Sequence, residues 1–214
     1  MEAIHRIYGE KEIIGVVYIV LLLLWAVANT IDGRRFKSFV RLGVSSLYIS
    51  TYKENISYRF QFVLSATGIL SWGLLLWHLA VWYEQGSYEW RAYLKYVLWI
   101  FIYLLFRYSL EYVLAALFDL QNEFKQSVFV RMSYWNVSGM YLSVLLMFQF
   151  YTFPHSTVYT GFIIVTAVLM LVLIYYHFID AYKNIVVSGL FYFILYFCTL
   201  EIAPVIWVLS RVIN

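Results

Sequence analysis

Six runs of apolar residues, each long enough to cross a bilayer, follow one another along the chain with short polar segments between them. The runs cover approximately residues 13–31, 61–83, 94–118, 135–153, 157–179 and 185–209. A transmembrane helix needs about 20 mostly apolar residues, and unbroken apolar runs differ from the alternating pattern of a transmembrane strand. Helices also satisfy their own backbone polar groups, as lipid requires. The pattern therefore predicts an all-α polytopic membrane protein, a six-transmembrane-helix bundle that forms one domain over residues 1–214.

The polar segment after the first run has the pattern of an amphipathic helix. Apolar residues recur three or four positions apart from Phe36 to Tyr48, whereas Lys37 and Arg41 lie off that stripe. A basic amphipathic helix lies naturally in the membrane interface, with its cations near anionic headgroups. We therefore expect one interfacial helix over residues 36–48, on the cytoplasmic side. A docking surface for a partner protein is the alternative use of this segment.

The orientation follows from the distribution of lysine and arginine between the two sides. The segments after the first, third and fifth runs carry nine of these residues, and the other side carries five. Cytoplasmic loops are richer in lysine and arginine. We therefore expect both termini to lie outside, and the segment after the first run to lie in the cytoplasm.

The three segments on that side share a short pattern. Each opens with an apolar–Asp pair and continues with an aromatic–Lys pair. The residues are Asp32 and Lys37, Asp119 and Lys125, and Asp180 and Lys183. An aspartate at a helix C-terminus is unfavourable for the helix dipole, so each is expected to find a cation nearby. Whether the pattern marks three repeated helical hairpins or only the positive-inside bias is left open.

The composition agrees with a membrane domain and narrows the partners. Apolar residues make up 64% of the chain and charged residues 13%, against roughly 25% charged in soluble domains. The net charge of +3 is small for a nucleic-acid-binding protein. We expect the partners to be the lipid bilayer and other membrane-protein subunits, or further copies of this chain, and no nucleic acid.

Two charged residues interrupt the third run. Arg107 and Glu111 are four positions apart, so they share one helix face and can pair. Ionisable residues in a membrane helix are costly unless they are paired, and they often mark functional sites. Two interpretations stay open, a structural ion pair that faces the bundle and an element of a gate or proton relay.

A lone acid, Glu201, lies in the outer half of the last run. Pro204 follows three residues later and frees the carbonyl of Leu200 from its helical hydrogen bond, which opens a polar spot beside the acid. His78 and Gln149 are expected at a similar depth. Glu201 either stays protonated and hydrogen-bonded, or handles protons or cations, or contacts a partner helix.

No pattern of catalytic residues or metal ligands is recognisable. The zinc-protease, nucleophile-elbow, phosphate-loop and dinucleotide motifs are all missing, so we expect a protein without enzymatic activity, metal or cofactor. Bis-histidine haem ligation is a weaker alternative, for which His155 would have to approach His78.

The C-terminal part of the chain carries a resemblance to a known family. Its residues are the pair Tyr182-Lys183 and the run Gly-Leu-Phe-Tyr-Phe-Ile-Leu-Tyr-Phe-Cys-Thr-Leu-Glu-Ile-Ala-Pro over 189–204. This part resembles an uncharacterised family of integral membrane proteins of Bacteroidetes-type bacteria, which has only a domain-of-unknown-function label. The similarity extends more loosely to residues 34–48 and 122–135. The resemblance implies a multi-pass protein of the bacterial inner membrane, and it makes Glu201 and Pro204 part of a family feature.

Together these observations favour a non-catalytic subunit or scaffold of a bacterial inner-membrane envelope complex, such as one for secretion or gliding. The competing hypothesis is a small transporter or proton-conducting protein that uses Glu201 and the pair Arg107 and Glu111. A stoichiometric partner after purification would favour the first hypothesis, and ion flux in liposomes the second.

Overall fold

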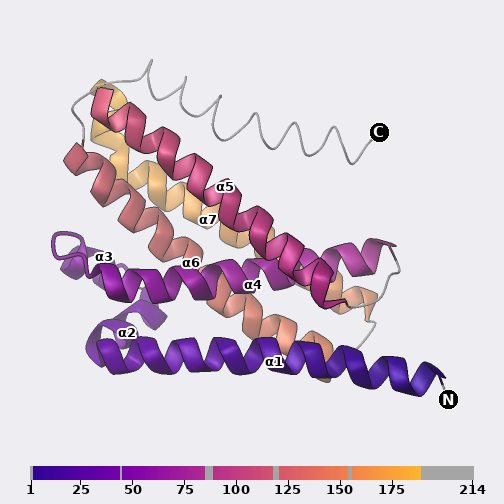
Figure 1. The fold of residues 1–214 in the computed structure, drawn as a ribbon. Coiled ribbons are helices and arrows are strands. Elements are labelled where there is room, and N and C mark those ends of the chain that lie inside the picture. The colour runs from indigo at the N-terminus through magenta and orange to yellow at the C-terminus, as the bar shows by residue number, and fades with distance from the viewer. Residues whose placement is uncertain (1, 44, 85–88, 118–120, 154–155, 189–214) are drawn as a thin grey trace, which may run out of the picture. The chain divides into compact units, whose positions relative to one another are not determined.

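The computed structural model describes residues 2–43, 45–84, 89–117, 121–153 and 156–188, and all regular structure in these ranges is helical (Figure 1). The elements are α1 (Glu2–Ile31), α2 (Gly33–Val40), the 3-10 helix η1 (Arg41–Gly43), α3 (Leu47–Tyr52), α4 (Tyr58–Glu84), α5 (Trp90–Leu117), α6 (Gln121–Tyr151) and α7 (Thr157–Ser188). The predicted all-α class is confirmed.

The chain divides into two compact units, Met1–Ile174 and Tyr175–Asn214. The first contains α1 to α6 and α7 up to Ile174, and it is the unit in which the site described below lies. The described part of the second unit is the end of α7.

Four helices in the described ranges are long and apolar enough to cross a membrane. They are Glu12–Ile31, Tyr58–Tyr83, Trp90–Val113 and Thr157–Tyr176, which correspond to four of the six predicted spans. The predicted span 135–153 lies almost wholly within α6 but is less apolar, because serine, asparagine and glutamine occupy its inner face. Most of the predicted span 185–209 lies outside the described residues. Membrane-spanning helices are therefore supported, and the count of six stays a prediction.

The central helix of the first unit is α4, which packs against α1, α5 and α6 (Figure 1). In the most apolar stretch of α4, 56% of the residues are buried, against 22% in α1, 17% in α5 and 22% in α7. The outer faces of α1, α5 and α7 are apolar, whereas serine, threonine, asparagine and glutamine side chains lie buried on α4 and α6. This distribution suits a bundle in lipid, where polar groups must find partners inside the protein.

The predicted single interfacial helix over residues 36–48 is wrong in one respect, because three short helices replace it. Helix α2 ends at Val40, and the hydroxyl of Tyr141 on α6 donates a hydrogen bond to the carbonyl of Val40. The ring of Tyr141 also lies so close to Gly43 that an added Cβ would come within 2.8 Å of it. The apolar stripe is partly confirmed, since Phe39 and Tyr48 are buried.

The segment after α5 also differs from the prediction. The two cations of the predicted cytoplasmic loop after the third run are Lys125 and Arg131, and both lie in α6, which begins at Gln121. Lys125 is exposed, and Arg131 is only 5% exposed. The chain has no proline or glycine between Gln121 and Ser138, so nothing in the sequence stops the helix from extending this far.

Candidate functional site: a buried ion network between two helices

Three charged residues meet in the interior of the first unit. Arg107 on α5 donates from its Nε to Oε1 of Glu111, over 3.1 Å, as the spacing of four residues predicts. Arg131 on α6 donates from a terminal guanidinium nitrogen to the other carboxylate oxygen, Oε2. Each oxygen of Glu111 therefore accepts from a different arginine, and the carboxylate joins α5 to α6.

Two tyrosines of α5 complete the surroundings of the network. The Nη1 of Arg107 donates to the hydroxyl oxygen of Tyr103 over 3.3 Å, and the guanidinium of Arg131 lies 5.6 Å from the ring centre of Tyr108. Arg107 is 8% exposed and Glu111 is 5% exposed, so the pair is buried inside the protein. Charges at this depth are retained only when they are paired and hydrogen-bonded.

Arg131 is the member of the network that the sequence analysis missed. It precedes the predicted span 135–153, so the sequence predicts it to be a loop cation. Its position in an unbroken helical stretch, one turn before the predicted span 135–153, is the available signal. Nothing in the sequence indicated that α6 would bring it beside Glu111.

A second group of polar side chains follows the contact between α4 and α6. The amide nitrogen of Asn136 donates to the Oγ of Ser65 over 3.4 Å, and the Oδ1 of Asn136 faces the backbone at Gly68. Thr67 and Ser71 are buried on the same helix, α4. The two helices approach closely here, since a Cβ added at Gly68 would come within 2.4 Å of the Asn136 Oδ1.

His78 and Gln149 lie on these same two helices, further toward their C-terminal ends. His78 is buried, and its ring centre lies 5.1 Å from that of Phe150, the residue after Gln149. The side-chain nitrogen of Gln149 donates to the carbonyl of Phe153 over 3.2 Å. The structure thus places both at one end of the α4–α6 contact, whereas Glu201, Pro204 and His155 lie outside the described residues.

The aspartate at the end of α1 pairs with a cation, as expected. The cation is Arg35 and not Lys37 of the shared pattern. Asp32 is the N-cap of α2, where its side chain accepts from the backbone nitrogen of Arg35 and pairs with the Arg35 guanidinium at 3.5 Å. Arg35 is buried over the ring of Tyr52, 4.3 Å from its centre, and donates to the carbonyl of Asn55. Burial also raises the pKa of Tyr48 in α3 above its ordinary value.

The other predicted loop residues take no part in these contacts or cannot be placed. Lys37 and Arg41 are exposed on α2 and η1. Asp119 lies outside the described residues, and the side chains of Asp180 and Lys183 are not described. Asp32 is therefore the one member of the set whose pairing the structure describes.

The chemistry available in the described ranges is that of hydrogen bonds and ion pairs. No group of three or more histidine, cysteine, aspartate or glutamate side chains there is placed to hold a metal ion. The charged network instead links helices α5 and α6 by ion pairs. A carboxylate with a separate arginine on each oxygen holds two backbones at a fixed distance.

Comparison with known proteins gives one match. No curated protein and no solved structure shows significant similarity to this chain. A family described as a domain of unknown function, DUF4271, matches residues 14–212, which is most of the chain. The protein therefore belongs to the DUF4271 family, which is uncharacterised.

Proposed function

We propose that this protein is a non-catalytic subunit or scaffold of a bacterial inner-membrane envelope complex, such as one for secretion or gliding. The observation that carries the proposal is the network of Arg107, Glu111 and Arg131. Three of the four buried charged residues in the described ranges engage one another and join α5 to α6, so they serve to fix helix positions.

The outer faces of the bundle offer the surface that a subunit needs. Large apolar side chains on α5 and α7 are exposed, among them Trp99, Phe106 and Leu169. Such faces suit lipid and partner helices alike, because both present hydrocarbon. Aromatic anchors of this kind are often the residues that dominate protein interfaces.

Purification of the tagged full-length chain from native membranes in mild detergent tests the proposal. We expect a stoichiometric membrane-protein partner. To find the interface, Leu23 on α1, Ile102 on α5 and Leu169 on α7 are each replaced by tryptophan. A lipid-facing position tolerates the larger ring. At a position that faces a partner helix, the ring disrupts close helix packing, and the partner is lost.

The exposed Phe62 on α4, replaced by tryptophan, is the matched control, since it exchanges one exposed aromatic ring for another. Homogeneous protein that contains this chain alone would refute the subunit proposal.

A small transporter or proton-conducting protein is the second candidate, and the polar side chains between α4 and α6 favour it. Buried polar atoms without a hydrogen-bond partner among the described residues include Oγ of Ser71, Oδ1 of Asn136 and Oε1 of Gln149. Unpaired polar groups in a membrane interior are costly, and water is their usual partner. Proton flux into liposomes that contain the purified chain, lost in Asn136→Leu and kept in Phe62→Leu, would support this candidate over the first.

A further inference from the structure

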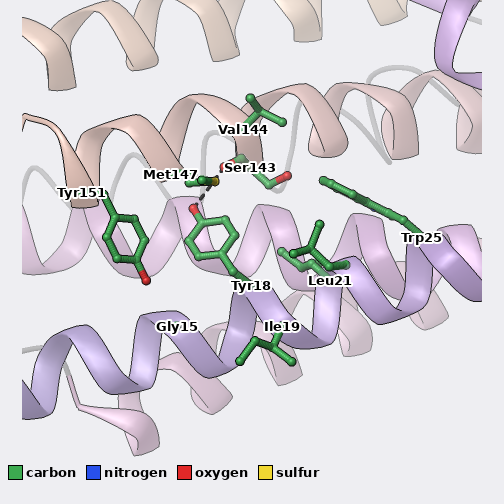
Figure 2. A pocket seen from close by; sticks show the side chains of 10 residues that line it. Gly15, Tyr18, Ile19, Leu21, Trp25, Ser143, Val144, Met147 and Tyr151 are labelled. Carbon is green, nitrogen blue, oxygen red and sulfur yellow. Dashed lines mark hydrogen bonds between the residues drawn. The ribbon is translucent and has the colours of Figure 1, made fainter.

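An apolar groove runs between α1 and α6 on the outside of the first unit (Figure 2). It encloses about 320 Å³, near the lower end of the roughly 300–1,000 Å³ typical of ligand pockets. Gly15 lies at one end beside Tyr151, Trp25 lies at the other, and Val144 and Met147 of α6 form the opposite wall.

Two polar atoms in the lining are turned to other protein groups, whereas the Nε1 of Trp25 is buried with no hydrogen-bond partner among the described residues. The hydroxyl of Tyr18 donates to the carbonyl of Ser143 over 3.0 Å, and the hydroxyl of Ser143 donates to the carbonyl of Met140 over 2.7 Å. Figure 2 shows the Tyr18 bond crossing from α1 to α6. The surface that remains is mostly hydrocarbon, and cavities of that kind exclude water.

The groove opens on the membrane-facing side of α1. Ile19 and Leu22 line it and are 59% and 58% exposed, in the middle of the candidate span Glu12–Ile31. From Gly15 to Trp25 the helix rises about 15 Å at 1.5 Å per residue. This length is half of a hydrocarbon core of about 30 Å, about the reach of one acyl chain, and it extends from near the Glu12 end of the span past its midpoint.

The volume of the groove distinguishes between occupants. About 320 Å³ spread over a length of about 15 Å leaves room for a slender occupant only. A helix with side chains measures about 10–12 Å across and does not fit. A single hydrocarbon chain does fit, because carbon atoms make contact at about 3.5–4.0 Å.

We propose that the groove between α1 and α6 is a binding site for one acyl chain of a membrane phospholipid. The chain lies along Gly15, Ile19 and Leu22 on one side and along Val144 and Met147 on the other. The absence of a side chain at Gly15 gives the chain its room next to Tyr151. The site goes beyond the proposed subunit function, since a lipid bound there belongs to the folded bundle whether or not a partner protein is present.

The proposal is tested by filling the groove with Gly15→Leu. A Cβ at Gly15 would meet its nearest neighbour, the Tyr151 hydroxyl, at 3.5 Å, which is ordinary contact, so the leucine enters the groove without a clash. Gly161→Leu is the matched control, because nothing lies within 4 Å of a Cβ at Gly161. Val144→Trp is a second groove-filling variant, for use if Gly15→Leu does not fold.

Native mass spectrometry of the full chain in mild detergent measures bound phospholipid. We expect about one phospholipid on the wild type and on Gly161→Leu, and about tenfold lower occupancy on the groove-filling variant. A phospholipid with a photoreactive acyl chain should label Ile19 and Met147 in the wild type. Equal occupancy in all variants, or labelling spread evenly over the exposed faces of α5 and α7, would overturn the proposal.

Cysteine cross-linking tests the protein occupants. Cys198 is the only cysteine of the chain, so Ile19→Cys can report on both possibilities. A disulfide between Ile19→Cys and Cys198 of the same chain would show that the C-terminal run fills the groove. A disulfide between two Ile19→Cys chains that also carry Cys198→Ser would show that a second copy does. Either result refutes the lipid site.

Discussion

Replacement of Glu111 by glutamine should destabilise the bundle more than any other single change in the ion network. The carboxylate accepts from Arg107 and Arg131 at once, whereas the amide keeps one acceptor and turns its NH₂ group toward an arginine. Hydrogen bonds to charged groups contribute about 1.5–3 kcal/mol each, and removing one partner of a buried ion pair costs about 3–5 kcal/mol. At about 2–4 °C per kcal/mol for a chain of this size, the unfolding temperature should fall by roughly 6–20 °C.

The third charge sets the order of effects among the variants. The spacing of Arg107 and Glu111 alone predicts that removing both harms less than removing either. With Arg131 present, that double variant still leaves an arginine buried without its carboxylate, so it should stay destabilised. Arg107→Gln should cost less than Glu111→Gln, because the Glu111–Arg131 bridge remains.

Replacement of all three residues by leucine or methionine should restore most of the unfolding temperature, since a buried ion triad can be exchanged for apolar residues. Thermal unfolding in detergent, followed by size-exclusion chromatography, measures each variant. Glu54→Gln, at an exposed position, is the control and should melt like the wild type. The reasoning fails if Glu111→Gln also melts with the wild type, or if the apolar triple variant melts no higher than Glu111→Gln.

Three further predictions concern other parts of the chain. Gly68→Ala should destabilise the α4–α6 contact by about 1–3 kcal/mol, because its Cβ would lie 2.4 Å from the Asn136 Oδ1, and Gly161→Ala should melt no lower than the wild type. Topology reporters in residues 32–59 should read out in the cytoplasm, and a periplasmic signal would reverse the proposed orientation. If Glu201 handles protons or contacts a partner helix, Glu201→Gln should abolish ion flux or partner binding at normal membrane levels, whereas full activity would show that Glu201 is only a protonated core acid.

The parts of the fold that the sequence predicts well are those that lipid dictates. Four apolar runs appear as helices of membrane-crossing length within a few residues of their predicted bounds, because hydrocarbon leaves an isolated run no alternative to a helix. The contact between Arg107 and Glu111 was predictable for a similar reason. Both residues lie on one helix, and a spacing of four determines their distance whatever surrounds them.

The parts that escaped prediction depend on contacts between elements far apart in the sequence. Where α2 ends at Val40 and η1 begins, Tyr141, about a hundred residues later, occupies the space beside Gly43 and donates to the carbonyl of Val40. Arg131 became a network residue because α6 packs against α5. No periodicity or local propensity at residues 36–48 or 121–135 encodes these neighbours.

Among the long helices, α6 has the weakest apolar signal, and it makes the most varied contacts. It ion-pairs with α5, packs closely on α4 at Gly68, and accepts the Tyr18 hydrogen bond from α1 at Ser143. Between Phe129 and Tyr141 most of α6 is covered by protein, so polar side chains can occupy its faces there without contact with lipid. The low hydropathy of α6 agrees with this burial. For related chains, the least apolar long helix is where buried polar contacts should be sought first.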